Sequence, residues 1–429
     1  MKYLSFNIIL VVLFLLVTNT TFAQFNSNDT TGLWKFCYIK GEEFYERTLK
    51  DWYELNKRGG IAWNEHDTQM YLIQHFKRLQ NKFGKANIVF DTIVGTGLIV
   101  EINGNAKSNN TLFIRPEIDA LYYPKTDSTD AEIRHSCAHS VGMSVSCSLA
   151  EILLEDKKIH WKKVVFLFSP SEEATPSGLD SMLRKMNLKK YGKIVALGQH
   201  MSTDVPNHHV EVRSKTAQAS SQILKINIDA SALKGGHIAD TNNINPLEVW
   251  DILKYQITEK IYQLSKGSKY LLRWSNIITS SPPDAPFNVL CQKVKCIGNF
   301  RTFDPVHEVQ GLKSIDSLIS TFSHKYKDKK VIISRDHEQP IPVLENDSTL
   351  TKSVRYWGSL YLGNTIQIHK LRIGSDDFAI FKKYGIPAVL LRVGIKAKST
   401  LHKQDFEILD PTILKTSLGL FTYLVYNLK

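Results

Sequence analysis

The sequence predicts an α/β chain in which a mixed, largely parallel sheet is interrupted by an inserted ferredoxin-like α+β domain. Three observations lead to this prediction. Apolar runs alternate with helical patterns up to about residue 200, which is typical of parallel sheets. A β-α-β-β-α-β order then occupies residues 212–335. Patterns of the first kind resume at about residue 336 and continue to the last residue.

Length and composition place the chain among ordinary globular proteins. It has 429 residues, of which 43% are hydrophobic and 22% are charged, so we expect two or three folding units and exclude a disordered chain. Five cysteines exclude a small disulfide-framed domain. The net charge of +12 comes from scattered lysines and arginines without a recognisable binding module, so no nucleic-acid partner is expected.

The N-terminus has the layout of a secretory signal peptide. Lys2 precedes an apolar run at 6–17, and small residues at 21–23 offer a cleavage site. We therefore predict a signal peptide at residues 1–23 and export to the periplasm or beyond. A retained N-terminal anchor is the alternative, although the apolar run is short for a full span. No later run reaches about 18 apolar residues, so no stable membrane span is expected after processing.

Residues 24–211 carry the first set of elements. The apolar run at 163–168 (KVVFLF) is typical of a strand buried on both faces, and Gly59-Gly60 separates the first two helical patterns. The predicted helices lie at 43–56, 67–83, 138–155 and 177–186, and the predicted strands at 87–94, 97–102, 111–115, 163–168 and 194–197.

Residues 212–335 read as a separate small domain. Alternating apolar residues at 223–228 indicate a half-buried strand, and Asn245-Pro246 is a typical helix start. The remaining elements are helices from about 246 and 309 and strands at 270–280, 293–303 and 330–334. Residues 336–429 then return to the first domain, with a helix at 375–384, a strand at 388–393 and a closing helix at 413–426.

Four segments carry residues with ligand or acid–base chemistry. They contribute Cys137 and His139, Glu172 and Glu173, His200, and His402. Three of the four follow the carboxyl end of a predicted parallel strand, where open α/β sheets place their ligands. Thiolate, imidazole and carboxylate together suit a transition metal such as Zn²⁺, Mn²⁺, Co²⁺ or Ni²⁺.

The adjacent pair Glu172-Glu173 can divide two roles between neighbouring side chains. One carboxylate can bind a metal while the other takes a proton from a metal-bound water. Two adjacent acids in a loop are also common as plain solvated residues. Their place directly after a buried strand favours the functional interpretation.

Short motifs in a fixed order connect the chain to a known family. The motifs are RPEIDAL at 115–121, HSCAH at 135–139, PSEE at 170–173, KGGH at 234–237, NVL at 288–290, GNFRTF at 298–303, GSDDF at 374–378 and LH at 401–402. With these motifs the chain resembles the metal-dependent amidohydrolases and metallopeptidases that include aminoacylases, hippurate hydrolases, N-acetyl-diaminopimelate deacetylases and plant auxin-conjugate hydrolases. The resemblance implies a catalytic domain at 24–211 and 336–429 with a dimerisation domain inserted at 212–335.

The resemblance also implies a dinuclear metal site and a substrate class. Two divalent ions (Zn, Mn, Co or Ni) would be held by Cys137, His139, Glu173, His200 and His402. The substrate would be a small N-acyl amino acid or a short peptide, and a homodimer is compatible with the family pattern.

Further roles follow from the same resemblance. Glu172 would be the general base, and Asp119 would support a metal ligand. His237 would reach the active site of a neighbouring subunit and steady the oxyanion. Asn288 and Arg301 would hold the free carboxylate of the substrate.

The chain departs from the family pattern in four places. Ala138 and Ser140 stand where glycine and aspartate are usual, Glu117 replaces an aspartate, and Asp376 replaces a glutamate. Ala138 and Ser140 motivate an alternative, a catalytically weakened relative that binds metal or ligand. Another alternative is a cysteine amidase that uses Cys137 and His139 without metal.

The other cysteines are expected to have no catalytic part. Cys37 and Cys147 are predicted to be structural or to have no role. Cys291 and Cys296 would point to opposite faces of a regular strand, so neither a bond nor a metal site is expected between them.

Overall fold

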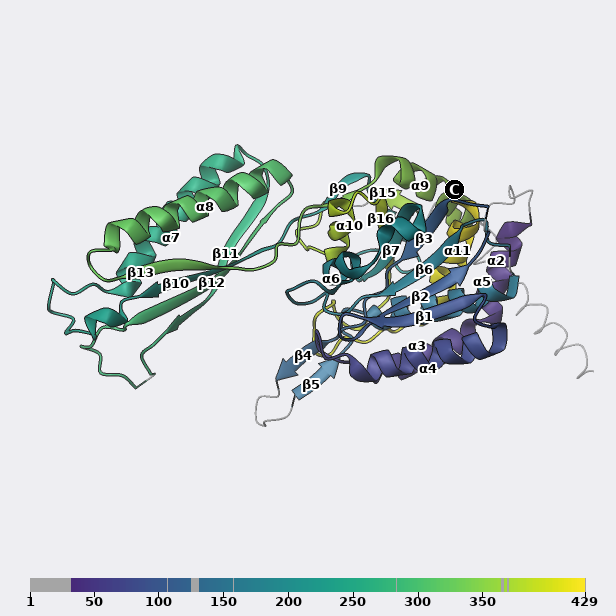
Figure 1. The fold of residues 1–429 in the computed structure, drawn as a ribbon, viewed down its shortest axis with the longest axis horizontal. Coiled ribbons are helices and arrows are strands. Elements are labelled where there is room, and N and C mark those ends of the chain that lie inside the picture. The colour runs from purple at the N-terminus through teal and green to yellow at the C-terminus, as the bar shows by residue number, and fades with distance from the viewer. Residues whose placement is uncertain are drawn as a thin grey trace, which may run out of the picture.

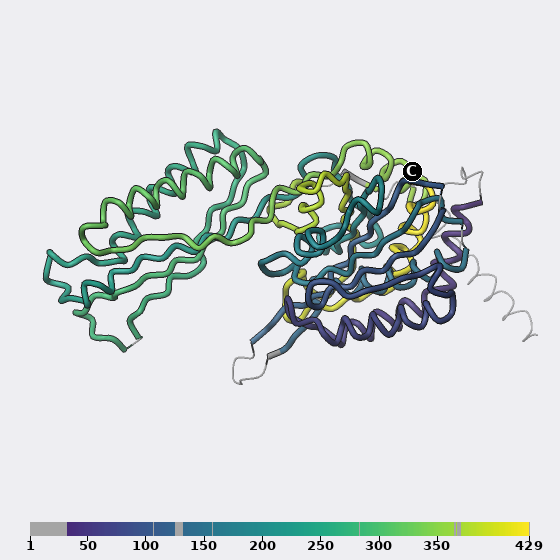
Figure 2. Tube along the Cα trace, in the orientation of Figure 1, coloured from purple at the N-terminus to yellow at the C-terminus, as the bar shows by residue number. Residues whose placement is uncertain are grey.

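The computed structural model describes residues 32–105, 107–124, 131–156, 158–282, 284–363, 366–368 and 370–428. The predicted signal peptide, residues 1–23, lies outside these ranges. Two lobes are joined by extended segments of chain (Figures 1 and 2). Within the described ranges, no helix combines the length and the apolar character that crossing a bilayer requires.

The larger lobe is built on an eight-stranded mixed sheet. Its strands lie in the order β1-β2-β6-β3-β7-β16-β8-β15, and the four central strands β6, β3, β7 and β16 are parallel. Their bounds are β1 Ile88–Ile93, β2 Gly97–Asn103, β3 Asn110–Ile114, β6 Lys163–Phe168, β7 Lys193–Ser202, β8 Val210–Val212, β15 Ile366–Ile368 and β16 Ala388–Gly394. The carboxyl ends of the parallel strands therefore share one edge of the sheet.

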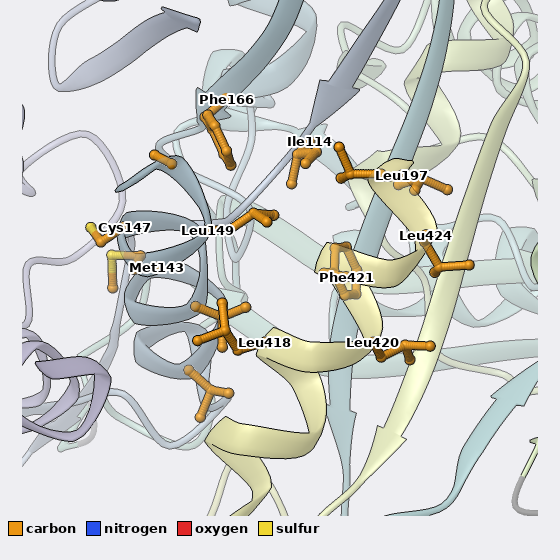
Figure 3. Close-up of a cluster of buried hydrophobic side chains, with 14 of the residues drawn as sticks. Ile114, Met143, Cys147, Leu149, Phe166, Leu197, Leu418, Leu420, Phe421 and Leu424 are labelled. Atoms are coloured by element: carbon orange, nitrogen blue, oxygen red, sulfur yellow. The ribbon is translucent and has the colours of Figure 1, made fainter. Parts of the chain in front are cut away.

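Helices cover both faces of this sheet, because its central strands are apolar on both sides. In β6, Val164, Phe166 and Phe168 belong to one core cluster, and Val165 and Leu167 to another. The first cluster includes residues of α5 (His139–Asp156) and α11 (Ile413–Asn427), whose side chains meet the sheet in Figure 3. The second includes residues of α6 (Gly178–Lys185) and α10 (Ile380–Lys383).

The other elements of the larger lobe complete its outer layers. Helices α2 (Leu33–Glu43), α3 (Tyr45–Asn56), α4 (His66–Phe83) and α9 (Ser348–Leu362) add to the first cluster. Two small two-stranded sheets pair β4 (Leu121–Pro124) with β5 (Ala131–Arg134) and β9 (Lys215–Gln218) with β14 (Leu344–Asn346).

The smaller lobe is a ferredoxin-like module. Its four antiparallel strands lie in the order β11-β12-β10-β13, and both helices cover one face of the sheet (Figure 1). The elements are β10 Gln222–Asp229, α7 Pro246–Ser265, β11 Tyr270–Thr279, β12 Lys293–Thr302, α8 Pro305–Tyr326 and β13 Ile332–His337. This confirms the predicted fold class, whereas the domain boundaries at 212 and 335 stay predictions.

The first helix of the small lobe begins where the sequence predicts, whereas the second begins at Pro305, before the predicted start at about residue 309. The Asn245 side chain accepts a hydrogen bond from the Leu247 amide at 3.0 Å, with proline as the next residue. Asp304 caps α8 in the same way, through the Val306 amide at 2.9 Å. An Asn or Asp cap followed by proline satisfies free amides and sets the first backbone angle of the helix. This is why Asn245-Pro246 predicts a helix start from sequence alone.

Several predicted bounds were wrong. The strand predicted to end at residue 197 continues to Ser202, so His200 lies inside β7 and pairs with Arg392 of β16. The polar residues hid this continuation, since a strand that enters a site loses its apolar pattern. The helix predicted at 43–56 is divided at Phe44. The helix predicted at 375–384 is a 3-10 turn, Asp377–Ala379, followed by the short α10.

Candidate metal centre

The carboxyl edge of the large sheet collects the chemically active residues. Glu172 and Glu173 follow β6, and Cys137 and His139 lie at the start of α5. His200 comes from within β7, and His402 from the loop after β16, at residues that are far apart in the sequence. The structure thus brings together five predicted ligands and the predicted base, while their roles stay predictions.

The thiol of Cys137 is the common neighbour in this cluster. Its Sγ lies 3.1 Å from His402 Nε2 and 3.3 Å from His200 Nε2. Two potential ligand groups share it, one with His139 and His200 and the other with Glu173 and His402. A thiol shared by two such groups is placed to bridge two adjacent cations.

The ligand atoms fit a metal in spacing and in their lack of other partners. Bonds of about 2.0–2.3 Å to a tetrahedral metal place ligand atoms about 3–4 Å apart. His402 Nε2 lies 3.5 Å from Glu173 Oε1, and His139 Nε2 lies 3.9 Å from the same oxygen. His139 Nε2 and Glu173 Oε1 are buried and have no hydrogen-bond partner. Buried polar atoms without partners are rare, and a divalent cation would satisfy both of these.

Supporting contacts orient the imidazoles. His139 Nδ1 lies 2.9 Å from the Asp119 carbonyl oxygen, which can only accept, so Nδ1 carries the proton and Nε2 is left as the ligand atom. The Asp119 carboxylate also accepts a hydrogen bond from the Glu173 amide at 2.8 Å. Asp119 therefore contacts two of the predicted ligands, and its predicted supporting role stays a prediction.

His200 has two competing neighbours at one nitrogen. Its Nδ1 lies 2.7 Å from the Met201 carbonyl oxygen and 3.2 Å from Arg392 Nη1. The carbonyl is closer and accepts only, so we assign the proton to Nδ1 and leave Nε2 facing Cys137. Arg392 is a buried residue of β16, and no sequence pattern identified it as part of the site.

Burial sets the protonation of the two central groups. Burial and then the neighbouring Glu173 raise the pKa of Glu172 well above its usual range. Burial and then the same Glu173 also raise the pKa of the Cys137 thiol. A thiol held protonated is a poor nucleophile, which weakens the metal-free cysteine alternative.

A buried arginine organises further carboxylates beside the cluster. Arg115 Nη2 lies 2.5 Å from Asp376 Oδ1 and 2.6 Å from Asp377 Oδ1, and Nη1 pairs with Glu117. Its side chain is fully buried. Glu117 and Asp376 are two of the family departures, and the structure shows that both changes meet at Arg115. The sequence contained all four residues but gave no sign that they would meet.

The loop that carries the two glutamates is held by another residue that the sequence did not single out. Glu65 is buried and accepts hydrogen bonds from the Ser171 amide at 2.9 Å and from the Thr96 hydroxyl. Ser171 has φ of 51°, and Ala138 and His402 both have φ of 64°. Left-handed backbone at non-glycine residues is costly and often marks functional sites.

The residues predicted to contact substrate do not all join this cluster. His237 Nε2 lies 3.3 Å from Asn288 Nδ2, beyond the end of β10 that is distant from the larger lobe. The eight residues of β10 span about 25 Å from the junction of the lobes to the strand end that precedes His237. Arg301, in contrast, lies near that junction and donates to the Ile373 carbonyl at 3.0 Å.

Comparisons with known proteins agree with this geometry. The model of peptidase family M20/M25/M40 matches residues 113–427. An N-acetyldiaminopimelate deacetylase of Bacillus cytotoxicus is 23% identical over 357 residues, covering 81% of this chain and 89% of that protein. Its counterpart in Lactobacillus acidophilus is 24% identical over 356 residues, covering 80% and 88%.

Solved structures share the fold. One from methicillin-resistant Staphylococcus aureus, described as a putative aminohydrolase, superposes with a TM-score of 0.75 at 20% identity, covering 91% of this chain and 98% of that one. A Bacillus subtilis protein, described as a dinuclear metal binding peptidase, superposes with a TM-score of 0.68 at 18% identity, covering 90% and 98%. At these identities the likeness concerns the fold.

Proposed function

The chain belongs to peptidase family M20/M25/M40, whose members are metal-dependent amidohydrolases and peptidases, and we propose that it cleaves N-acyl amino acids or short peptides. One observation carries the proposal. The buried and unpartnered atoms His139 Nε2 and Glu173 Oε1 lie in groups that share the Cys137 thiol, and the Glu172 carboxyl group lies beside them.

The side chains divide the work of hydrolysis. Cys137 would be shared by two divalent ions, with His139 and His200 on one side and Glu173 and His402 on the other. Such ions, when bound, supply Lewis-acid polarisation and a lower pKa for an attacking water. Zn²⁺, Mn²⁺, Co²⁺ and Ni²⁺ all suit this donor set.

Glu172 carries the proton through the reaction. Its carboxylate oxygen Oε2 lies 3.9 Å from His139 Nε2, at the edge of the ligand cluster. From there it accepts a proton from the attacking water and returns it to the amide nitrogen as the carbon–nitrogen bond breaks. Burial raises the pKa of Glu172 and so favours the protonated form, which is the form that returns the proton to the amide nitrogen.

The distance of His237 and Asn288 from the ligand cluster of the same chain supports an active site shared by two copies of the chain. His237 and Asn288 lie too far from Cys137 along the small lobe to serve the same chain's cluster without a large rearrangement. A second copy would bring them to the cluster, where His237 would steady the oxyanion and Asn288 would join Arg301 at the substrate carboxylate.

The surface of the small lobe is suited to such a second copy. β11 forms an edge of its sheet and pairs only with β12 among the described strands. Ile277 and Ile278 on this edge are each 47% exposed, and Tyr255 and Tyr262 on α7 are also exposed. A ten-residue edge strand with exposed apolar side chains is a ready site for pairing with another chain. We therefore include a homodimer in the proposal.

The proposed substrate class rests on the named relatives and on the positive charge of Arg301, which suits a substrate carboxylate. The relatives are N-acetyldiaminopimelate deacetylases, which supports an N-acyl amino acid with a free carboxylate. A panel of N-acetyl, N-benzoyl and dipeptide substrates, each with its carboxamide analogue, tests the proposal in the presence of Mn²⁺ or Zn²⁺. We expect turnover of carboxylates that is lost on chelation. Absence of turnover with every metal, while metal still binds, would favour the weakened relative.

That second candidate has a structural basis in two residues. Ser140 replaces the usual aspartate and its Oγ lies 3.3 Å from Asn56 Oδ1, so it adds no charge beside His139. Ala138 holds left-handed backbone that glycine would adopt more easily. Chelator-resistant activity that a thiol reagent blocks would instead point to the cysteine amidase.

Export is a separate part of the proposal. It rests on the basic, apolar and small-residue order of residues 1–23. Expression of the full chain with fractionation and N-terminal sequencing tests it. Mature protein that begins near residue 24 in the exported fraction is the expected result, and uncleaved protein in the cytoplasm contradicts it.

A further inference from the structure

A second group of metal-ligating side chains lies in the helical layer of the larger lobe. It consists of Asp51 on α3, His75 on α4 and Cys147 on α5. One ligand atom from each lies within 4.8 Å of the others. The side chains are deeply buried, with exposures of 8%, 7% and 0%. Three helices thus converge on one point with a carboxylate, an imidazole and a thiol.

This group is distinct from the centre at the sheet edge. Cys147 follows His139 by eight residues on α5, which separates them by about 12 Å along the helix axis. Figure 3 shows Cys147 on the side of α5 that faces away from Leu149 and the sheet. The sequence predicted that Cys147 is structural or has no role.

The imidazole of His75 is buried without a hydrogen-bond partner. Neither of its ring nitrogens has a hydrogen-bond partner, although its side chain is buried. Its Nδ1 lies 3.6 Å from Asp51 Oδ2, which is longer than a hydrogen bond but matches the spacing of two ligands on one metal. The Cys147 carbonyl is close by, yet it does not meet hydrogen-bond geometry with the ring.

Neighbouring contacts hold the group in place. The Tyr71 hydroxyl donates to Asp51 Oδ1 at 2.6 Å, which leaves Oδ2 turned to His75. The Thr48 and Ser148 hydroxyls, 2.7 Å apart, tie α3 to α5 beside Cys147. Such outer contacts are typical of residues that orient metal ligands.

A cavity gives access from the surface. It has a volume of about 640 Å³ and is lined by residues of the three helices, including Asp51, His75 and Tyr71. Four basic residues lie on its wall, Arg47, Lys50, Arg78 and Lys82. Of these, Arg47 and Lys82 are paired with Glu151 at 3.0 and 2.9 Å. A thiolate and a carboxylate would balance the two charges of a divalent ion, so the filled site adds no net charge.

We propose that Asp51, His75 and Cys147 form a third metal site, for a thiophilic divalent ion such as Zn²⁺, that clamps α3 and α4 onto α5. The three donors are of the types that zinc takes, and a water from the cavity completes four-coordination. On binding, the Cys147 thiol releases its proton to solvent as the sulfur–metal bond forms, with no change of oxidation state. The role is structural and independent of hydrolysis.

Zinc counting on the full chain tests the proposal. Apo protein is equilibrated with Zn²⁺, freed of excess ion and analysed for metal per chain. We expect three zinc ions in the wild type and one in a variant with Cys137→Ala and His139→Ala. Adding Cys147→Ala to that variant should remove the last ion. Cys296→Ala, which truncates a buried thiol in the small lobe, is the matched control and should keep three.

A substitution that conserves side-chain volume tests the site in a protein that keeps its fold. Asp51→Asn keeps the volume of the side chain and an acceptor for the Tyr71 hydroxyl, and should weaken the third zinc at least tenfold. Cobalt substitution of the Cys137 and His139 double variant should still give a thiolate-to-cobalt band. Loss of all zinc from the Cys137 and His139 double variant, retention of its zinc after Cys147→Ala, or unchanged binding in Asp51→Asn would overturn the proposal. Because these readouts need no substrate, failure of hydrolysis would leave them unaffected.

Discussion

The two lobes bury polar groups in different ways. In the small lobe the buried carboxyl and imidazole groups among the described residues are Glu308 and His307, and its left-handed lysines, such as Lys266, lie at helix ends and turns. The larger lobe buries two arginines, several carboxylates and several histidines at one edge of its sheet. Three of its left-handed residues, Ala138, Ser171 and His402, lie in the same place.

The difference shows where structure serves folding and where it serves chemistry. The small lobe obeys local rules, so its elements follow from the spacing of apolar residues and from its helix caps. The edge of the large sheet breaks those rules with buried charge and strained backbone. Strained backbone and buried charge persist only where the surrounding structure holds them in place, and they cluster at sites that bind ligands.

The largest expected effect is a loss of catalysis when a glutamate of the larger lobe is replaced, compared with the same replacement in the small lobe. Glu172→Gln should lower kcat by about 10²–10⁴-fold, because it removes the proton acceptor while keeping the shape of the side chain. Glu308→Gln makes the same change in the small lobe and should keep near-normal kcat. Steady-state kinetics on the best N-acyl substrate measures both. Equal losses in the two variants would erase the contrast between the lobes.

A second contrast compares two arginines. Arg115→Met would leave Glu117, Asp376 and Asp377 buried without their cation, and should lower the free energy of unfolding by about 3–5 kcal/mol. Arg335 in the small lobe pairs with Asp316, whose side chain is 42% exposed, so Arg335→Met should cost at most about 1 kcal/mol. Urea unfolding at neutral pH checks both values, and similar losses would contradict the account.

A smaller effect should appear as a pH dependence in the small lobe. Burial raises the pKa of Glu308 to about 7, and Gln222 Nε2 donates to it at 2.6 Å. The folded state therefore binds this proton more tightly than the unfolded state, so its stability falls as pH rises from about 4 to about 7. Glu308→Gln should gain about 1–3 kcal/mol at pH 8 and less at pH 5. A gain that does not change with pH would refute the assignment.

The smallest effect concerns backbone strain. Ala138→Gly should stabilise the larger lobe by about 0.5–1 kcal/mol, because φ of 64° suits glycine. Lys266→Gly at the end of α7, where φ is 46°, is the matched change in the small lobe. Thermal unfolding followed by circular dichroism compares them. A loss of stability in Ala138→Gly would mean that its methyl group contributes more packing than strain.

The same contrast explains what could be predicted from the sequence. The order of the small lobe and the buried strand β6 followed from local periodicity, and the ligand cluster followed from motifs at strand ends. His200 was placed past its strand because the apolar run stops at residue 197 while the pairing with β16 continues. The meeting of Arg115 with Asp376 and Asp377, and the part of Arg392 and Glu65, depend on contacts between distant segments that no local pattern records.

The central claim is that Cys137 lies between two cations at the carboxyl edge of the large sheet. Anomalous diffraction from crystals grown with Zn²⁺ or Mn²⁺ tests it most directly. We expect two peaks within bonding distance of Cys137 Sγ, one also bonded to His139 and His200 and the other to Glu173 and His402. The absence of any peak at Cys137 in fully loaded crystals would contradict it.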